Sequence, residues 1–462
     1  MVFASGVFLY FFLPIFLAAY FLTPRKWKSF TIAVASYVFY GWWRPDFVLL
    51  MWVSTVVDYV CGQRIERGRE HGLRGKRWVG LSLAVNLGLL GYFKYFNFGV
   101  DTLNYVLEPY GWVPMDVARV VLPVGISFYT FQTLSYTVDV YRGSAKPVRS
   151  FADFMCYVAM FPQLVAGPIV RYNTIADQLH ERKHSVDMFY RGVLCFQSGL
   201  AKKVLLADVL GGLVAQAFDG RVLGVGDSWF ASVAYTFQLY FDFSGYSDMA
   251  IGLGLMMGFR LPVNFDRPLI SKSITELWRR WHISLSSFLR DYLYIPLGGN
   301  KRGPTRTYVN LWLTMVIGGL WHGAAWTYVV WGVWHGSLLE LERLAGKRPL
   351  YSRAPAFVQT ALTLCLITLG FTCFRAQDLS HAGRLVGSMF GVVDGVAAGI
   401  TVRPVHLLTM GIAAIVVYGF PTTQSLVQRA RLAWVIPLQL LFLLALIHLH
   451  HEDQVPFLYF QF

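Results

Sequence analysis

Long apolar runs recur along almost the whole chain, from Val2 to His450, and they constrain the fold more than any other feature. A run of about 20 apolar residues is long enough to cross a bilayer as an α-helix. Only 14% of the residues are charged, whereas a soluble domain has roughly 25%. The sequence therefore predicts an all-α, polytopic integral membrane protein. We expect about eleven transmembrane helices plus re-entrant or interfacial helices, in a single domain over residues 1–462.

The net charge of +14 comes from basic residues in the short loops between apolar runs. This placement follows the positive-inside rule, so we reject nucleic-acid binding. The first basic residue, Arg25, comes after the first apolar run, which excludes a cleavable signal peptide and predicts an N-terminus outside the cytoplasm. The cysteines are odd in number and widely spaced, so we expect free buried thiols without disulfides. They are Cys61, Cys156, Cys195, Cys365 and Cys373.

The loop charges alternate between the two sides of the membrane up to the basic loop 142–149, and then the alternation fails. The segment 151–170 is apolar, yet Arg171, Arg182 and Lys183 follow it on what should be the opposite side. Pro162 and Gly167 interrupt this segment. A re-entrant or broken helix fits better than a full span, and such backbone needs protein or a cavity around it.

A histidine, His322, lies in the middle of the apolar run Leu311 to Leu339. An ionisable residue inside a membrane is a functional-site hypothesis by default; the alternative is a structural histidine in a helix bundle. Basic residues flank the run on both sides, and the 36 residues between Arg306 and Arg343 are fewer than the roughly 40 that two crossings need. We therefore expect either a hairpin that enters the membrane or a locally thin bilayer. Glycines at 318, 319 and 323 allow a bend.

A second polar motif lies inside an apolar span, and its members are Asp242, Ser244, Tyr246 and Asp248. Asp242 and Tyr246 are four residues apart, as are Ser244 and Asp248, so each pair can share a helix face. Carboxylates at membrane depth should face the bundle interior or a wet cavity. We interpret the motif as a buried polar network. Of its two possible roles, fixing the packing of helices is favoured over a direct role in function.

The basic segment 260–306 contains an amphipathic motif made of Trp278, Arg279, Arg280, Trp281 and His282. Arginine guanidinium groups can hold the phosphates of a thioester donor by charge-assisted hydrogen bonds. The alternative is an interfacial helix anchored by tryptophan and arginine. We expect His282 to contact the donor or to be structural, while a catalytic role stays open.

Two further groups of histidines need interpretation. His335 is 13 residues after His322, which on a straight helix is roughly 20 Å of rise, so the two can meet only if the glycines break the helix. The cluster at the end of the last apolar run is better explained by polar anchoring than by metal binding, and we expect no metal site. That cluster comprises His448, His450, His451, Glu452 and Asp453.

Several stretches together resemble the membrane-bound O-acyltransferases, specifically the bacterial branch concerned with alginate O-acetylation. They run nearly end to end: 40–43, 122–128, 163–168, 241–248, 264–265, 278–286, 321–323 and 457–462. The resemblance implies that His322 is the principal catalytic histidine and that the region around His282 belongs to the same reaction chamber. His282 and His335 are the candidates for a supporting second histidine. It also implies a central funnel open to both faces of a bacterial inner membrane.

The resulting hypothesis is an O-acyltransferase that takes an acetyl group from a thioester such as acetyl-CoA, with no bound cofactor. The acceptor is a hydroxyl of an extracytoplasmic polysaccharide, and an SGNH-hydrolase-like partner completes the transfer. A buried, neutral His322 can serve as general base or accept the acyl group as an acyl-imidazole. Two alternatives stay open: a transporter of an acylated carrier, and a scaffold subunit of a polymer-secretion complex.

Overall fold

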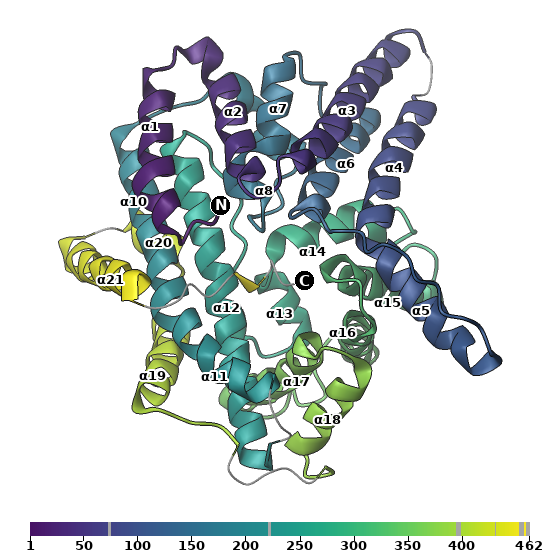
Figure 1. The fold of residues 1–462 in the computed structure, drawn as a ribbon, viewed down its shortest axis with the longest axis vertical. Coiled ribbons are helices and arrows are strands. Elements are labelled where there is room, and N and C mark those ends of the chain that lie inside the picture. Colours follow the sequence, from purple (N-terminus) through teal and green to yellow (C-terminus); the bar gives the residue numbers. More distant parts are fainter. Residues whose placement is uncertain (73–74, 220–222, 394–398, 430, 452–456, 459–462) are drawn as a thin grey trace. The chain divides into compact units, whose positions relative to one another are not determined.

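The fold is described from a computed structural model of the chain, covering all residues except 73–74, 220–222, 394–398, 430, 452–456 and 459–462. The described residues form α-helices, short 3₁₀ and π segments and loops, with no β-strand among them (Figure 1). This confirms the all-α prediction. The chain divides into two compact units, Met1–Val193 with Ala250–Pro262, and Leu194–Met249 with Val263–Phe462. The prediction of a single domain stays a prediction.

The helices of the first unit pack mainly through aromatic and small polar side chains. They are α1 (Leu13–Leu22), α2 (Lys28–Gly41), α3 (Asp46–Glu70), α4 (Lys76–Leu90), α5 (Phe96–Leu107), α6 (Ile126–Arg142), α7 (Phe151–Ala159), α8 (Phe161–Leu164) and α9 (Tyr172–His180). A buried network joins α3 to α4, because Ser82 Oγ and Asn86 Nδ2 donate to the two carboxylate oxygens of Asp58 at 2.5 and 2.8 Å. Buried polar groups of this kind specify how helices pair.

The segment 151–170 is a broken helix, as the sequence predicted. Helix α7 ends at Ala159, Met160 leaves the helical conformation (φ −50°, ψ 110°), and α8 adds one further turn. The chain then returns in an extended stretch, and Tyr157 Oη lies 3.1 Å from the carbonyl oxygen of Val170. Gly167 is required here, because a Cβ on it would lie 2.3 Å from the carbonyl oxygen of Pro162. The whole segment from Phe154 to Val170 is buried, as irregular backbone in a membrane protein must be.

The second unit contains the remaining helices and the candidate site. They are α11 (Val209–Phe218), α13 (Ile274–Arg280), α14 (Ile283–Leu289), α15 (Pro304–His322), α16 (Trp326–Leu344), α17 (Ala356–Arg375), α18 (Leu379–Met389), α19 (Pro404–Gly419), α20 (Thr423–Gln428) and α21 (Leu432–His451). The chain passes from one unit to the other three times: within α10 (Val186–Ala201), within α12 (Val225–Met256), and between Pro262 and Val263 in the loop after α12.

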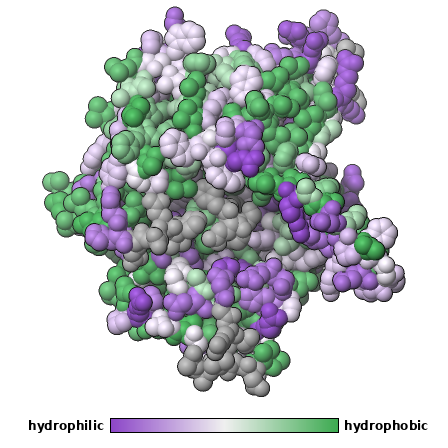
Figure 2. Space-filling view, in the orientation of Figure 1, coloured by the Kyte–Doolittle hydropathy of each residue, from purple (hydrophilic) through white to green (hydrophobic). Residues whose placement is uncertain are grey.

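Four described helical segments are long and apolar enough to cross a membrane: Asp46–Glu70, Lys76–Tyr110, Ala356–Arg375 and Leu432–His451. Val7–Leu22 and Pro404–Gly419 are shorter apolar helices. The expected number of about eleven spans therefore stays a prediction. Helix α21 shows the lipid-facing pattern best, because Leu440, Leu444 and Ile447 are each more than half exposed. Hydrophobic side chains gather widely on the molecular surface (Figure 2), as expected where lipid covers a protein.

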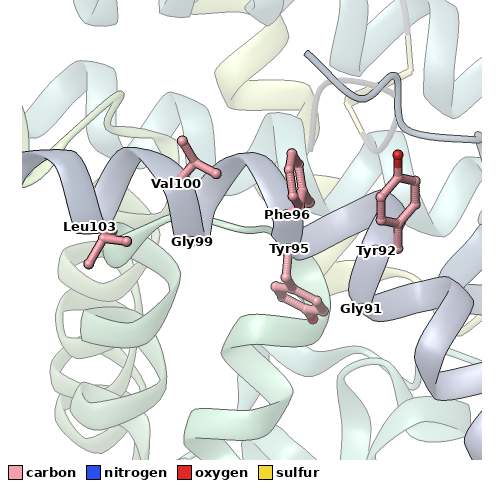
Figure 3. Close-up of a pocket in the computed structure, with 7 residues that line it drawn as sticks. All are labelled: Gly91, Tyr92, Tyr95, Phe96, Gly99, Val100 and Leu103. Atoms are coloured by element: carbon pink, nitrogen blue, oxygen red, sulfur yellow. The ribbon is translucent and has the colours of Figure 1, made fainter. Parts of the chain in front are cut away.

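A groove of about 310 Å³ follows the helical segment that joins α4 to α5. Figure 3 shows Tyr92 and Phe96 on one side of this segment and Tyr95 on the other. The residues lining the groove are aromatic, aliphatic or glycine: Gly91, Tyr92, Tyr95, Phe96, Gly99, Val100 and Leu103. None of them is a general base or nucleophile at neutral pH, so this groove is not a candidate reaction centre.

Candidate active site

His322 is the last residue of α15, at the tip of a tight antiparallel hairpin. Helices α15 and α16 are joined by only three residues, 323–325, so they form a helical hairpin. Whether it enters the membrane part-way or crosses a thin bilayer stays a prediction. Two glycines allow the helices to pack closely. A Cβ on Gly319 would lie 2.2 Å from the carbonyl oxygen of Tyr328, and a Cβ on Gly323 would lie 2.0 Å from the ring of Tyr328. Gly318 meets only the side chain of Leu289, at 3.1 Å. The bend predicted from these glycines is not present: α15 ends at His322, and Gly319 and Gly323 instead allow α16 to approach closely.

Aromatic rings surround the imidazole of His322, which is 6% exposed. The ring centroids of Trp331 and Phe374 lie 5.2 and 5.3 Å from its own, both edge to face. The ring of Trp321 lies at 5.1 Å. These neighbours come from α15, α16 and α17, so the fold holds His322 in a setting with little access for water.

His282 occupies a strained position between α13 and α14. Its backbone is left-handed (φ 44°, ψ 53°), a conformation that is uncommon outside glycine and that costs on the order of 1 kcal/mol. Asn264 compensates, because its backbone carbonyl accepts from Ile283 N–H at 2.9 Å and its side-chain oxygen accepts from Ser284 N–H at 3.2 Å. Such strain recurs at functional sites.

Asn264 also fixes the proton on the His282 ring. The backbone N–H of Ser284 requires the amide oxygen of Asn264 on that side, and the same oxygen lies 3.1 Å from His282 Nδ1. A neutral imidazole must therefore carry its proton on Nδ1, which leaves the lone pair on Nε2. His282 lies outside the apolar helices described above, and burial lowers its pKa to about 3. The ring is consequently a neutral base at physiological pH.

The two histidines lie close together although 40 positions separate them in the sequence. Their ring centroids are 6.3 Å apart with an interplanar angle of 55°. Trp321 contacts both rings, with its centroid 6.0 Å from that of His282. One small group, such as a hydroxyl, can reach both imidazoles at this separation, which is the geometry that acid–base chemistry needs.

His335 is separated from His322 by the ring of Trp331, which contacts both imidazoles. Its ring centroid is 4.9 Å from that of Trp331 and 5.3 Å from that of Trp278. The side chain is fully buried, and neither ring nitrogen has a hydrogen-bond partner among the described residues. The turn after His322 reverses the chain, so both histidines contact Trp331 despite the 20 Å rise expected for a straight helix.

The motif around Trp278 divides between packing and the surface. Trp278 and Trp281 face the interior, where Trp281 packs on Phe371 at 5.1 Å. Arg280 Nε lies 3.0 Å from Glu276, and its Nη1 also contacts Asp266, so this guanidinium is already paired. Arg279 is exposed, and no ion pair joins it to an acidic residue within the described part of the chain. Arg279 is therefore better placed than Arg280 to meet a charged ligand.

Both carboxylates of the Asp242 motif are paired with lysines of a π-helical segment, Lys202–Asp208. Lys203 lies 2.7 Å from Asp242, and Lys202 lies 2.7 Å from Asp248. Two consecutive lysines of this π segment therefore reach the same helix, α12. Ser244 and Tyr246 are buried on α12, and Tyr246 stacks on Phe457 at 4.5 Å. This motif is a charge-paired network that joins helices.

Sequence reasoning missed several residues that position the site. Asn264 was noted only as part of a stretch that resembles the family, although it fixes the orientation of the His282 ring. The adjacent lysines at 202 and 203, inside an apolar run, were a visible signal that each needed a partner. No signal in the sequence marked Phe374 or Trp331, because contacts between distant aromatic residues leave no local pattern.

No group of three or more histidine, cysteine or carboxylate side chains that could hold a metal ion occurs among the described residues. At the end of α21, His450 Nδ1 and His451 Nδ1 instead contact carbonyl oxygens of their own helix, at 2.7 and 2.9 Å. Glu452 and Asp453 of the same cluster lie outside the described residues, as do residues 459–462 of the last resembling stretch.

A buried histidine pair in an apolar, all-helical chain is the kind of site expected of a membrane enzyme that transfers acyl groups. Residues 144–356 match the model of the family described as "MBOAT, membrane-bound O-acyltransferase family". Together with the relatives below, this match shows that the chain belongs to the membrane-bound O-acyltransferase family. It is an integral membrane protein and an O-acyltransferase.

Three similar proteins illustrate the range of the family. "Probable alginate O-acetylase AlgI" of Pseudomonas putida is 44% identical over 488 aligned positions that cover 100% of both chains. The protein of the same description from Pseudomonas aeruginosa is 49% identical over 393 positions, covering 84% of this chain and 75% of its own. "Peptidoglycan O-acetyltransferase" of Helicobacter pylori is 33% identical over 432 positions, covering 85% and 80%.

Proposed function

We propose that this protein transfers an acetyl group from a cytoplasmic thioester to hydroxyl groups of an extracytoplasmic polysaccharide. The observation that carries the proposal is the buried pair His282 and His322, with 6.3 Å between ring centroids in an aromatic setting. The relatives named for O-acetylation of alginate and of peptidoglycan support acetyl as the transferred group and an envelope polymer as the acceptor. An alginate-like polymer is the first candidate.

In the proposed reaction the acceptor hydroxyl attacks the thioester carbonyl carbon. His322 takes the hydroxyl proton as general base, the new C–O bond forms, and the C–S bond breaks. The departing thiolate receives that proton, so the histidine returns to its neutral form. A two-step route through an acyl-imidazole on His322 has the same balance. His282, whose lone pair lies on Nε2, is the second base within reach.

The surroundings of the pair suit this chemistry. Exclusion of water by Trp321, Trp331 and Phe374 limits hydrolysis of the thioester. The exposed guanidinium of Arg279 is available for the phosphates of a donor such as acetyl-CoA. We place the protein in a bacterial inner membrane with its N-terminus outside the cytoplasm, and we expect an SGNH-hydrolase-like partner to complete delivery to the polymer.

The experiment uses purified full-length protein with acetyl-CoA labelled in its acetyl group. We expect release of free CoA by the wild type alone, and transfer of label to an alginate oligosaccharide once a membrane extract that supplies the partner is added. Both should fall by at least a hundredfold in His322→Gln and remain unchanged in His450→Gln, because His450 is exposed at the end of α21 and is not a member of the histidine pair. Release of CoA that is independent of His322 would remove this residue from the mechanism.

The same experiment separates the two alternative functions. A transporter or a scaffold subunit would leave acetyl-CoA intact in the purified protein, although polymer acetylation would still be lost in cells that lack it. No described feature favours either alternative over the enzyme.

A further inference from the structure

Two basic segments far apart in the sequence meet in the first unit. One contains Arg25 and Lys28, at the start of α2, and the other contains Arg182 and His184, between α9 and α10. We call these four residues the basic cluster. Arg182 Nη2 donates to Ser29 Oγ, beside Lys28, and its guanidinium carbon lies 4.9 Å above the ring of Phe259.

Tyr20 connects the two segments and fixes the orientation of His184. Its hydroxyl lies 2.6 Å from the carbonyl oxygen of Met257 and 2.8 Å from His184 Nε2. The carbonyl can only accept, so the hydroxyl proton points to Met257 and His184 Nε2 must be the donor. The other ring nitrogen, Nδ1, then becomes a second donor whenever the ring is protonated.

Two members of the basic cluster, Lys28 and Arg182, place positive charge in a buried or partly buried position. Lys28 is 8% exposed, its Nζ donates to the carbonyl oxygen of Tyr20 at 2.6 Å, and it lies 4.1 Å from the centre of the Tyr20 ring. Burial, and then the charges of Arg182 and Arg25, lower the pKa of Lys28. Nη1 of Arg182 is also buried, and it has no hydrogen-bond partner among the described residues.

No carboxylate forms an ion pair with Arg25, Lys28 or Arg182 in the described part of the chain. Among the acidic residues of the adjoining segments, Asp153 lies 3.5 Å from His180, and Glu181 is exposed. Like charges brought together in a partly buried place repel one another, and an unpaired buried N–H destabilises the folded state. A bound anion would offset both costs.

Exposed apolar side chains surround the cluster on the same elements. Phe21 is 47% exposed, Leu22 85% and Trp27 52%. Tryptophan beside lysine and arginine, next to an apolar helix, is the pattern of a membrane–water interface. A ligand that satisfies this surface has a phosphate group for the cations and hydrocarbon for the apolar residues.

We propose that the basic cluster is a binding site for a phosphate-type anion, and that its source is the headgroup of an anionic phospholipid whose chains lie against α1. The phosphate contacts Arg182 and Lys28, with Arg25 and His184 at the rim. This site is independent of the proposed acetyl transfer, since its residues belong to the first unit and both His282 and His322 belong to the second. A soluble phosphate compound is the other source with the same chemistry.

The test measures lipid binding to purified full-length protein in a neutral detergent, by native mass spectrometry and by the shift in melting temperature. The probes are phosphatidylglycerol, phosphatidylcholine, inorganic phosphate and CoA. We expect preferential binding of phosphatidylglycerol, weakened about fivefold in Arg182→Gln and largely retained in Arg182→Lys. Arg67→Gln, which removes an exposed charge of the same unit, should bind like the wild type.

Three results overturn the proposal in whole or in part. Equal binding of phosphatidylglycerol and phosphatidylcholine would exclude an anionic lipid as the ligand. Equal affinities of Arg182→Gln and Arg67→Gln for every probe would exclude the anion site itself. Stabilisation by inorganic phosphate or CoA that depends on Arg182, without any by phosphatidylglycerol, would support the anion site and exclude the lipid source. If Arg182→Gln does not fold, Arg25→Gln tests the same prediction at an exposed position.

Discussion

At the scale of single residues, the site depends on an amide that does no chemistry itself. Asn264 Oδ1 accepts from the backbone and the hydroxyl of Ser284 and lies beside His282 Nδ1, while Asn264 Nδ2 donates to Ser247 Oγ at 3.1 Å. The amide thereby holds a strained backbone and sets the tautomer of a buried imidazole. Asn264 is a positioning residue in this sense, since it acts through His282.

Replacing Asn264 separates these two effects. In Asn264→Ala we expect acetyl transfer to fall by about a hundredfold, because the His282 ring loses its orientation. In Asn264→Asp an acceptor oxygen remains but carries charge, which should raise the pKa of His282 and move the acidic limb of the pH–rate profile to higher pH. The measurement is kcat against pH for both variants. An unchanged profile in Asn264→Asp would show that His282 is not part of the reaction.

The burial of His282 also predicts how stability depends on pH. The folded-state pKa of about 3 lies below the unfolded value of about 6.5, so between these values the unfolded chain binds more protons. Stability must therefore fall as the pH is lowered from about 6.5. We expect the melting temperature in detergent to decline less steeply between pH 6.5 and pH 4 in His282→Gln than in the wild type. Parallel curves would mean that the ring is protonated in the folded protein.

At the scale of elements, the hairpin of α15 and α16 places His322. Its two helices approach until backbone meets backbone, since a Cβ on Gly319 would reach the carbonyl of Tyr328 and one on Gly332 would lie 2.6 Å from the carbonyl of Met315. Neither neighbour is a side chain that can turn away. The position of His322 at the tip therefore depends on glycine at both sites.

This contact predicts different effects for two adjacent glycines. Gly319→Ala should destabilise the protein by about 3 kcal/mol and displace His322, lowering acetyl transfer by about a hundredfold. Gly318→Ala is the matched control, because its Cβ meets only the flexible side chain of Leu289, and it should cost less than about 1 kcal/mol. Melting temperature and kcat check both variants. Equal effects of the two substitutions would contradict the proposed backbone contact.

At the scale of the whole chain, the sequence predicted what local composition controls. The all-α membrane class follows from the apolar runs, the broken helix from Pro162 and Gly167, and the hairpin from the short distance between two basic flanks. Contacts between residues far apart in the chain could not be predicted from the sequence. Nothing local to His282 shows that Asn264 will orient it, and the π turn that points Lys202 and Lys203 toward α12 has no recognisable spacing.

The broken helix carries a prediction about topology. The two basic loops on either side of 151–170 should lie on one side of the membrane, since Asp153 at the start of α7 lies 3.5 Å from His180 at the end of α9. In a variant with Cys365 and Cys373 replaced by serine, single cysteines at exposed positions report their side: Lys146→Cys, Lys183→Cys and Val113→Cys. A membrane-impermeant maleimide should label Val113→Cys in intact spheroplasts and the other two only in inverted vesicles. Labelling of Lys146→Cys and Lys183→Cys from opposite sides would mean that α7 and α8 cross the bilayer completely, and the loop charges would then need another explanation.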